Sequence, residues 1–255
     1  MKTVILAGGF GTRLSEETEV LPKPMIEIGG RPLLWHLMKI FSSQGFSDFA
    51  VALGYKGAVI KRYFLHYPQL MGDLTVNLGT GECRAMSQPE EDWTVELVET
   101  GAETMTGGRL KRLRDRLTST FFFTYGDGLS NVNLAELLAF HKSHGRLATV
   151  TAVQPPQRFG VLGLDGDRVR TFSEKQDGTT NHINGGFFVL EPEAIDCIAG
   201  DETSWEREPC ERLAAAGELF AYFHRGFWQC VDTLHELRLL RQMWETGKAP
   251  WKVWA

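Results

Sequence analysis

The chain has 255 residues, of which 43% are hydrophobic and 23% charged, and its 27 Lys and Arg against 32 Asp and Glu give a net charge of −5. These proportions are close to those of an ordinary globular protein, so they exclude a disordered, collagen-like or fibrous chain. The mild acidity argues against a broad nucleic-acid-binding surface, although a local cluster of Arg and Lys can still hold a small anion.

The four cysteines, Cys83, Cys197, Cys210 and Cys230, are widely spaced and form no C-x-x-C pair. Their spacing argues against a zinc or redox motif and predicts reduced thiols, as in a cytoplasmic protein. No segment reaches the ~18 consecutive apolar residues of a membrane span, and the apolar run at 3–7 is too short for the core of a signal peptide. We therefore expect a cytoplasmic protein that binds no membrane.

Predicted strands and helices alternate in the first part of the chain. A β-branched apolar run at 3–7 ends at a glycine loop and predicts a buried strand. Apolar residues at helical spacing follow at 32–41, then a second strand at 49–53 and a second helix at 57–64. This order is the βαβ rhythm of a parallel sheet with helices on both faces.

The rest of the chain continues this pattern after a polar stretch at 72–91, which we interpret as an excursion of short strands and loops. Strands are predicted at 94–98, 120–125, 147–153 and 182–190, and helices at 110–117, 134–144, 208–216 and 233–245. No linker, repeat or low-complexity tract interrupts the sequence. We therefore expect one α/β domain over 1–255, a Rossmann-like three-layer αβα fold with a mainly parallel central sheet, a small β excursion and a helical C-terminal region.

A glycine-rich loop at 8–14 follows the first predicted strand. Glycines there let the backbone approach a ligand closely, and successive N–H groups can hold an anion. Leu14 stands where a dinucleotide-binding G-x-G-x-x-G motif needs its third glycine, and the loop is not a P-loop either. A plain structural turn is the alternative, but Arg13 favours a phosphate site because its planar guanidinium matches phosphate oxygens.

Lys23 is the second unusual feature, because Pro22 and Pro24 flank it and restrict the backbone on both sides. The alternative is a solvated lysine in an extended loop. Together with Arg13, we interpret Lys23 as part of a clamp for a triphosphate.

Two aspartates are candidate metal ligands. Asp127 follows a strongly apolar predicted strand, and the carboxyl ends of strands in open α/β sheets bind ligands. Asp232 precedes the last predicted helix. The alternatives are a turn residue for Asp127 and a helix N-cap for Asp232. Two carboxylates that act with waters and substrate phosphates are a typical arrangement for Mg²⁺.

Other polar and aromatic residues receive plainer interpretations. His141 and His144 share one face of a predicted helix without a metal ligand at the right spacing, so we predict surface residues. Trp251 and Trp254 are interpreted as packing anchors.

Several segments resemble the sugar-1-phosphate nucleotidylyltransferases. The signature shared by all branches matches Leu6 to Leu14 and Pro22 to Met25. The cytidylyl branch is similar nearly end to end, at Met105 to Arg112, Phe123 to Gly128, Arg158 to Gly160, Ser173 to Lys175, Ile183 to Leu190 and Gly247 to Lys252. The chain departs from the family pattern at Gln176 and at Cys230-Val231, which affects only the fine geometry beside functional positions.

The resemblance implies a role for each matching residue. The nucleotide-binding positions would be Leu6, Ala7, Gly8, Gly9, Phe10, Gly11, Thr12, Arg13, Lys23, Thr104, Arg109 and Gly126. The sugar-phosphate positions would be Glu174, Lys175, Asn184 and Gly185. Asp127 and Asp232 would bind Mg²⁺, and the catalytic residues would be Arg13, Lys23, Asp127 and Asp232.

The implied reaction transfers the cytidylyl group of CTP to α-D-glucose 1-phosphate, giving CDP-glucose for the dideoxysugars of surface polysaccharide. The alternatives are a branch that uses dTTP, UTP or GTP, a nucleotide-sugar-binding protein without turnover, and a nicotinamide-dependent dehydrogenase, which the missing third glycine disfavours. The resemblance also implies a homo-oligomer with no nucleic-acid partner.

Overall fold

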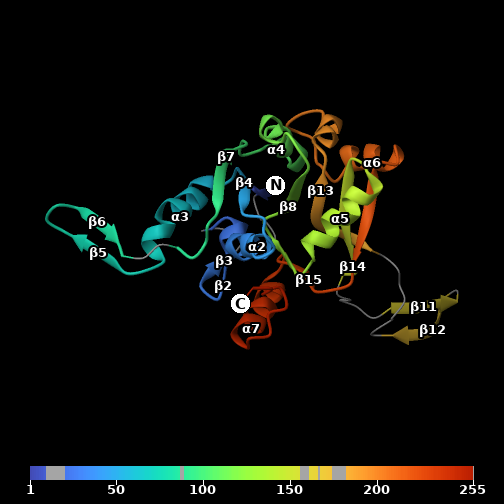
Figure 1. Ribbon diagram of the computed structural model, residues 1–255. Coiled ribbons are helices and arrows are strands. Elements are labelled where there is room, and N and C mark those ends of the chain that lie inside the picture. The colour runs from blue at the N-terminus through green and yellow to red at the C-terminus, as the bar shows by residue number, and fades with distance from the viewer. Residues whose placement is uncertain (10–20, 87–88, 156–160, 166, 174–181, 255) are drawn as a thin grey trace.

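Seven strands form the central sheet, in the order β14-β10-β13-β8-β1-β4-β7 (Figure 1). The computed structural model describes the chain except for residues 10–20, 87–88, 156–160, 166, 174–181 and 255. The strands are β1 (Lys2–Ala7), β4 (Asp48–Leu53), β7 (Thr94–Glu99), β8 (Phe121–Tyr125), β10 (Ala148–Val153), β13 (Ile183–Leu190) and β14 (Leu219–His224). The inner strands β1, β4 and β8 are buried over nearly their whole length, as their continuous apolar sequences predict.

The sheet is mainly parallel, as predicted. β1 pairs in parallel with β4 and with β8, β4 with β7, and β10 with β14, whereas β13 runs antiparallel between β8 and β10. From β1 the chain moves outward to β4 and β7 and then returns to β8 on the other side of β1. The strand order therefore reverses at β1, and open α/β sheets bind ligands beside the carboxyl ends of the strands at such a point.

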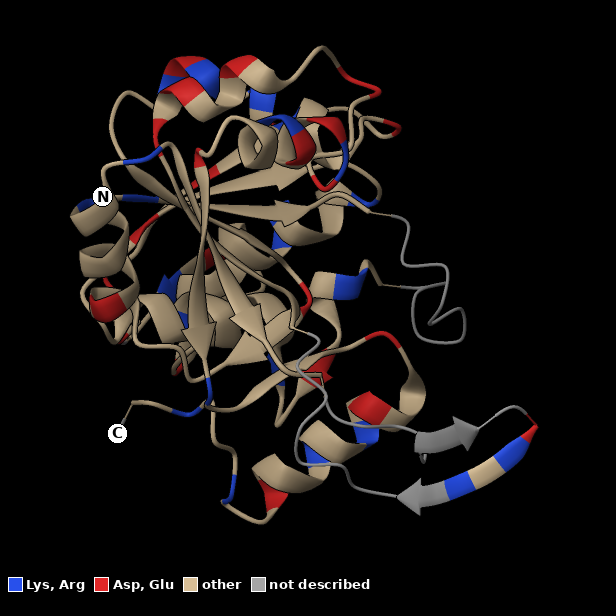
Figure 2. Cartoon of the chain, turned by 90° about the vertical axis from the view of Figure 1, so that its right-hand side faces the viewer, with Lys and Arg blue, Asp and Glu red and all other residues tan. Residues whose placement is uncertain are grey.

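Helices cover both faces of the sheet, which confirms the three-layer αβα prediction (Figure 1). One face carries α2 (Leu33–Ser42), α3 (Gly57–Leu70) and α5 (Leu134–His144), and the other carries α4 (Thr106–Lys111), the 3₁₀ helix η4 (Pro192–Cys197) and α6 (Glu208–Ala215). Successive residues of β1 point to opposite faces, so Val4 packs in one cluster and Ile5 in the other. Figure 2 shows most charged residues on the helices and loops around the sheet.

A third apolar cluster lies under the C-terminal helix α7 (Leu234–Glu245). It joins α7 to the short pairs β2 (Glu27–Ile28) with β3 (Arg31–Pro32) and β9 (Gly128–Ser130) with β15 (Trp228–Cys230). Trp251 is fully buried there and Trp254 packs against the cluster, which confirms both as packing anchors.

Two further hairpins extend the fold. β5 (Leu74–Asn77) pairs with β6 (Glu82–Ala85), as expected for the excursion at 72–91, whereas β11 (Val161–Asp165) with β12 (Arg168–Ser173) was not predicted. Among the described residues, no helix is long and apolar enough to cross a membrane.

The structure corrects two predictions. The helix expected at 110–117 begins at Thr106 and ends as α-helix at Lys111, and a 3₁₀ turn, η3 (Arg114–Arg116), follows. A glycine pair usually indicates a loop, but here Gly108 lets α4 pack so closely on a neighbouring segment that a Cβ would lie 2.5 Å from the carbonyl oxygen of Asp201. His141 is not a surface residue: its ring is buried, with Nδ1 2.8 Å from Thr149 Oγ1 and Nε2 3.2 Å from Glu191 Oε1.

Candidate active site

The carboxyl ends of β1 and β8 lie against each other at the point where the strand order reverses. The backbone N–H of Gly126, just after β8, donates to the carbonyl of Leu6 in β1 at 2.9 Å. A Cβ at position 126 would lie 2.8 Å from that carbonyl oxygen and 2.9 Å from Pro24 Cγ, so a larger residue would force the strands apart. Glycine here brings Asp127 directly beside the end of β1.

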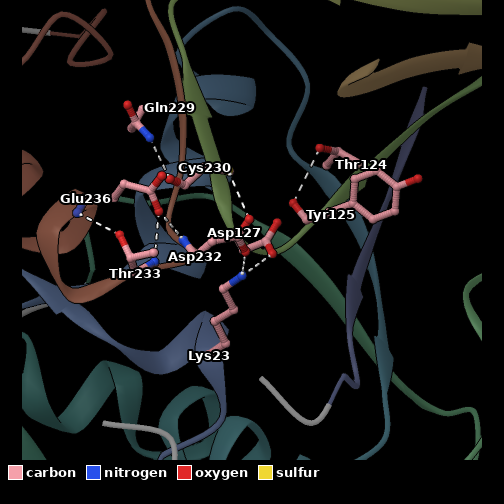
Figure 3. A network of polar contacts seen from close by, with 9 residues as sticks. All are labelled: Lys23, Thr124, Tyr125, Asp127, Gln229, Cys230, Asp232, Thr233 and Glu236. Atoms are coloured by element: carbon pink, nitrogen blue, oxygen red, sulfur yellow. Dashed lines mark hydrogen bonds and ion pairs between the residues drawn. The ribbon is translucent and has the colours of Figure 1, made fainter. Parts of the chain in front are cut away.

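Lys23 opens a short 3₁₀ helix, η2 (Lys23–Met25), which is anchored by the buried Pro24 and Met25. Its ammonium lies between two carboxylates, with Nζ 2.6 Å from Asp127 Oδ2 and 2.7 Å from Asp232 Oδ1 (Figure 3). Burial by itself would lower the pKa of Lys23, but the two carboxylates outweigh this and the pKa is raised. The side chain is 13% exposed, so the alternative of a solvated lysine is wrong.

Asp232 is directed into the site by the start of α7. Thr233 is the N-cap of this helix, and it forms a reciprocal capping box with Glu236, so the N-cap alternative for Asp232 is wrong. Glu236, which is 4% exposed, accepts the backbone N–H groups of Asp232 at 2.7 Å and Thr233 at 2.8 Å. The backbone at Asp232 is therefore fixed while its carboxylate contacts Lys23 (Figure 3).

The donor set around Lys23 fits a hard divalent cation. Carboxylates of Asp127 and Asp232, 32% and 30% exposed, reach one common point that an ammonium group now occupies. Within the described ranges no group of three or more His, Cys, Asp or Glu could hold a metal, and Mg²⁺ is commonly held by only one or two carboxylates plus waters and substrate phosphates. Burial raises the pKa of the neighbouring Cys230 thiol to about 12.

Three hollows lined by described residues meet along this edge of the sheet. A central hollow of about 210 Å³ is lined by Lys23 and Gly126 among others. Asp127 and Tyr125 line both this central hollow and a second hollow of about 310 Å³, which we call the β13 hollow because Asn184 and Gly185 lie in its wall.

The third hollow, of about 190 Å³, shares Leu6, Gly9 and Thr106 with the central hollow. We call it the α4 hollow, and its other lining residues include Gly8, Thr104 and Arg109. The shared residues place the three hollows next to one another along this edge, and we refer to them together as the cleft.

The buried side chain of Arg109 fixes the backbone that forms the wall of the α4 hollow. Its guanidinium is only 4% exposed, and burial lowers its pKa. It donates to Gly8 O at 3.0 Å, Leu53 O at 3.0 Å, Thr100 Oγ1 at 2.8 Å, Gly101 O at 2.7 Å and Ala102 O at 3.1 Å. These oxygens belong to the ends of β1, β4 and β7, so Arg109 holds three strand ends at fixed spacing.

The β13 hollow is held by hydrogen bonds within its own wall. The indole Nε1 of Trp228 donates to Gly185 O at 2.6 Å, and the N–H of Gly186 donates to Asn184 Oδ1 at 2.8 Å. Asn184 is exposed toward solvent at the start of β13, which leaves its amide accessible to a ligand.

The structure thus brings most of the described candidate residues into one cleft. The candidates Phe10, Gly11, Thr12, Arg13, Glu174 and Lys175 lie outside the described residues. Sequence reasoning missed Thr106, Tyr125 and Trp228 as lining residues. Their positions next to candidate residues could have indicated two of them, since Tyr125 directly precedes Gly126-Asp127 and Thr106 directly precedes the Gly-Gly-Arg segment.

Comparisons with known proteins show which protein family this chain is similar to. A family model described as nucleotidyl transferase matches residues 2–242. The glucose-1-phosphate cytidylyltransferase of Salmonella typhi is 52% identical over 256 aligned residues, which cover all of both chains. A probable glucose-1-phosphate cytidylyltransferase of Bacillus subtilis (strain 168) is 46% identical, again over all of both chains. The crystal structure of HddC from Yersinia pseudotuberculosis has a TM-score of 0.70 at 23% identity and covers 95% of this chain and 99% of that one, a likeness of fold.

Proposed function

Because this chain belongs to the nucleotidyl transferase family, we propose that it transfers the cytidylyl group of CTP to α-D-glucose 1-phosphate and releases pyrophosphate. The observation that carries the chemistry is the meeting of Lys23, Asp127 and Asp232 where the central and β13 hollows join. The choice of CTP and glucose 1-phosphate is supported by the two full-length relatives, whose names give glucose 1-phosphate as the acceptor and a cytidylyl group as the group transferred.

The reaction is a displacement at phosphorus. A phosphate oxygen of glucose 1-phosphate attacks the α-phosphorus of CTP, a new P–O bond forms, and the bond to the β-phosphate breaks to release pyrophosphate. A phosphate monoester has a second pKa of ~6, so the nucleophile is mostly dianionic at neutral pH and needs no general base. The barrier is the approach of two anions, which positioning and charge neutralisation lower.

The three hollows of the cleft can be assigned to the two substrates. We assign the nucleotide to the α4 hollow and the central hollow, where the backbone after β1 and the segment around Thr104 form the wall. We assign the sugar phosphate to the β13 hollow, with Asn184 and Gly185 as contacts. The roles of Arg13 on the triphosphate and of Glu174 and Lys175 on the sugar phosphate remain part of this proposal.

A divalent cation is a general requirement of nucleotidyl transferases of this family, and we propose Mg²⁺ held by Asp127 and Asp232. When bound, the ion would neutralise phosphate charge. Lys23 now pairs with both carboxylates, and we expect its ammonium to exchange them for phosphate oxygens when substrate enters. Catalysis then rests on Lys23 and Arg13 as neutralising cations and on Asp127 and Asp232 as the residues that would hold the metal ion.

The remaining expectations are also proposals: one domain over 1–255, a homo-oligomer in solution, a cytoplasmic location and a role in supplying sugars for surface polysaccharide. Light scattering coupled to size exclusion measures the assembly. A single scattering mass equal to one chain would contradict the homo-oligomer.

The test of function is a panel of nucleoside triphosphates. Purified protein is mixed with Mg²⁺, glucose 1-phosphate, pyrophosphatase and each triphosphate in turn, and phosphate release is followed. We expect rapid release with CTP and its loss on addition of EDTA. Release with another triphosphate instead would keep the chemistry and overturn the choice of base. No release with any triphosphate or sugar phosphate would contradict the enzymatic function.

A further inference from the structure

Glu206 joins two walls of the cleft, although no feature of the sequence marked it as functional. The hydroxyl of Tyr125 donates to Glu206 Oε1 at 2.6 Å, and the hydroxyl of Thr106 donates to Glu206 Oε2 at 2.7 Å. Tyr125 lies between the central and β13 hollows, and Thr106 lies between the central and α4 hollows. One carboxylate therefore connects both boundaries of the central hollow.

The segment that carries Glu206 is itself fixed to α4. The backbone N–H of Met105 donates to Asp201 O at 2.8 Å, that of Gly108 to Thr203 O at 3.2 Å, and that of Trp205 to Thr106 Oγ1 at 2.9 Å. Trp205 is fully buried. Its ring packs edge-on against the rings of Phe123 and Phe188. The neighbour of Glu206 in sequence is thus an anchor in the core, which fixes the backbone at Glu206. Its exposed carboxylate is held by the two hydrogen bonds from Tyr125 and Thr106.

Tyr125 is held from both ends. Its ring packs against Gly186 of β13, where φ is +79° and a Cβ would lie 2.9 Å from Tyr125 Cδ2. Burial and the Glu206 carboxylate raise the pKa of Tyr125 above its usual range, so its hydroxyl stays a hydrogen-bond donor. In Figure 3 the ring points away from the Lys23, Asp127 and Asp232 group. Its hydroxyl donates to Glu206 and also forms a hydrogen bond with the side chain of Asn184.

We propose that Glu206 is a positioning residue that sets the distance between the bound nucleotide and the bound sugar phosphate by tying Tyr125 to Thr106. This inference rests on the proposed function, which assigns the nucleotide to the α4 and central hollows, lined in common by Thr106, and the sugar phosphate to the β13 hollow, whose boundary with the central hollow is Tyr125. The α-phosphorus and the attacking oxygen meet in the central hollow, between the two walls. Displacement of reacting atoms by about 1 Å can cost on the order of 100-fold in rate, so a loosened wall is expected to affect turnover more than the binding of either substrate alone.

The experiment compares Glu206→Ala, Glu206→Gln and the control Glu202→Gln, an exposed carboxylate on the same segment. For each protein, kcat and both KM values are measured with CTP and glucose 1-phosphate, and CTP and CDP-glucose binding are measured by calorimetry. For Glu206→Ala we expect kcat to fall about 10- to 100-fold and CDP-glucose affinity about tenfold, with CTP affinity within about twofold of the parent. Glu206→Gln keeps one acceptor oxygen, so we expect an intermediate loss, and Glu202→Gln should match the parent.

A combination with Tyr125→Phe shows whether Glu206 acts through the tyrosine. We expect the double variant Glu206→Ala with Tyr125→Phe to lose little more than Glu206→Ala, because both changes remove the same hydrogen bond. If folded Glu206→Ala and Glu206→Gln, checked by circular dichroism, keep the parental kcat and CDP-glucose affinity, this inference is wrong while the proposed function stands. A parent that neither turns over nor binds CDP-glucose would overturn both.

Discussion

Lys23 and Arg109 are two cations at the same end of the central sheet, and they are held in opposite ways. Lys23 contacts two carboxylates that are themselves about one-third exposed, at the junction of two hollows. Arg109 is enclosed by neutral backbone and hydroxyl oxygens from three strand ends. An ammonium paired with accessible acids can exchange them for phosphate, whereas a guanidinium with five such bonds cannot leave without opening the cleft wall. We therefore propose that the first residue takes part in the chemistry and that the second preserves the shape of the cleft.

The largest expected effect comes from removing the enclosed cation. Arg109→Ala removes five hydrogen bonds that link three strand ends and empties the buried space that the side chain fills, and we expect a loss of about 3–5 kcal/mol in the free energy of unfolding, measured by urea denaturation. The control Arg112→Ala breaks an exposed ion pair with Asp201, and its free energy of unfolding should stay close to that of the parent. Equal losses in the two variants would contradict the architectural role of Arg109.

The second prediction concerns the acids that hold Lys23. Asp127→Asn removes one charge from the proposed metal site, and we expect kcat to fall on the order of 10²–10³-fold while the urea midpoint stays close to that of the parent. The exposed residue Asp115, changed to Asn, is the matched control. An unchanged kcat of Asp127→Asn at saturating Mg²⁺ would contradict its role as a ligand.

A buried basic side chain that carries no charge at neutral pH sharpens the comparison. His36 is fully buried, donates from Nε2 to Ile28 O at 2.8 Å and accepts at Nδ1 from Trp251 Nε1 at 3.4 Å. Burial lowers the pKa of His36 to about 4. Unlike Arg109, this ring has one carbonyl acceptor and a donor on its other nitrogen, so it remains neutral.

This lowered pKa predicts a dependence of stability on pH. Between pH 6.5 and 4 the unfolded chain binds a proton at His36 that the folded protein does not, so stability falls as the pH falls through this window. The loss is at most about 3 kcal/mol. In unfolding experiments from pH 7 to 4, His36→Gln should show a flatter slope than the parent, and the exposed His235→Gln should not. Parallel curves for all three would contradict the assignment.

The smallest effect tests whether Lys23 occupies the place of a metal ion. Lys23→Met leaves Asp127 and Asp232 without their shared counter-charge, so we expect Mn²⁺ to bind about tenfold more tightly in the absence of nucleotide, measured by electron paramagnetic resonance. CTP should bind more weakly to the same variant. Lys39→Met, which removes an ion pair with Glu91, is the control and should leave Mn²⁺ affinity unchanged. Weaker or equal Mn²⁺ binding by Lys23→Met would refute the exchange.

Much of the fold and part of the site were predictable from local pattern. The apolar runs of β1, β4 and β8 and the helical spacing of α2, α5 and α7 identified these elements within one or two residues. Lys23 was identifiable because the prolines beside it restrict the backbone, and Asp127 because it follows a strongly apolar strand, where open α/β sheets bind ligands. The prediction failed where distant contacts decide: the start of α4 depends on Asp201, and the burial of His141 depends on Thr149 and Glu191.

By itself, the sequence determined which segments become strands and helices and which residue types could neutralise phosphate, because hydrophobic periodicity and backbone restriction are local properties. Only the tertiary structure decided that Lys23 lies between Asp127 and Asp232, although 209 positions separate Lys23 from Asp232. It also decided that Arg109 turns its charge inward and that Glu206 joins Tyr125 to Thr106. These contacts arise from strand order and from the packing of α4 and α7, and residues far apart in the chain carry no local signal of them.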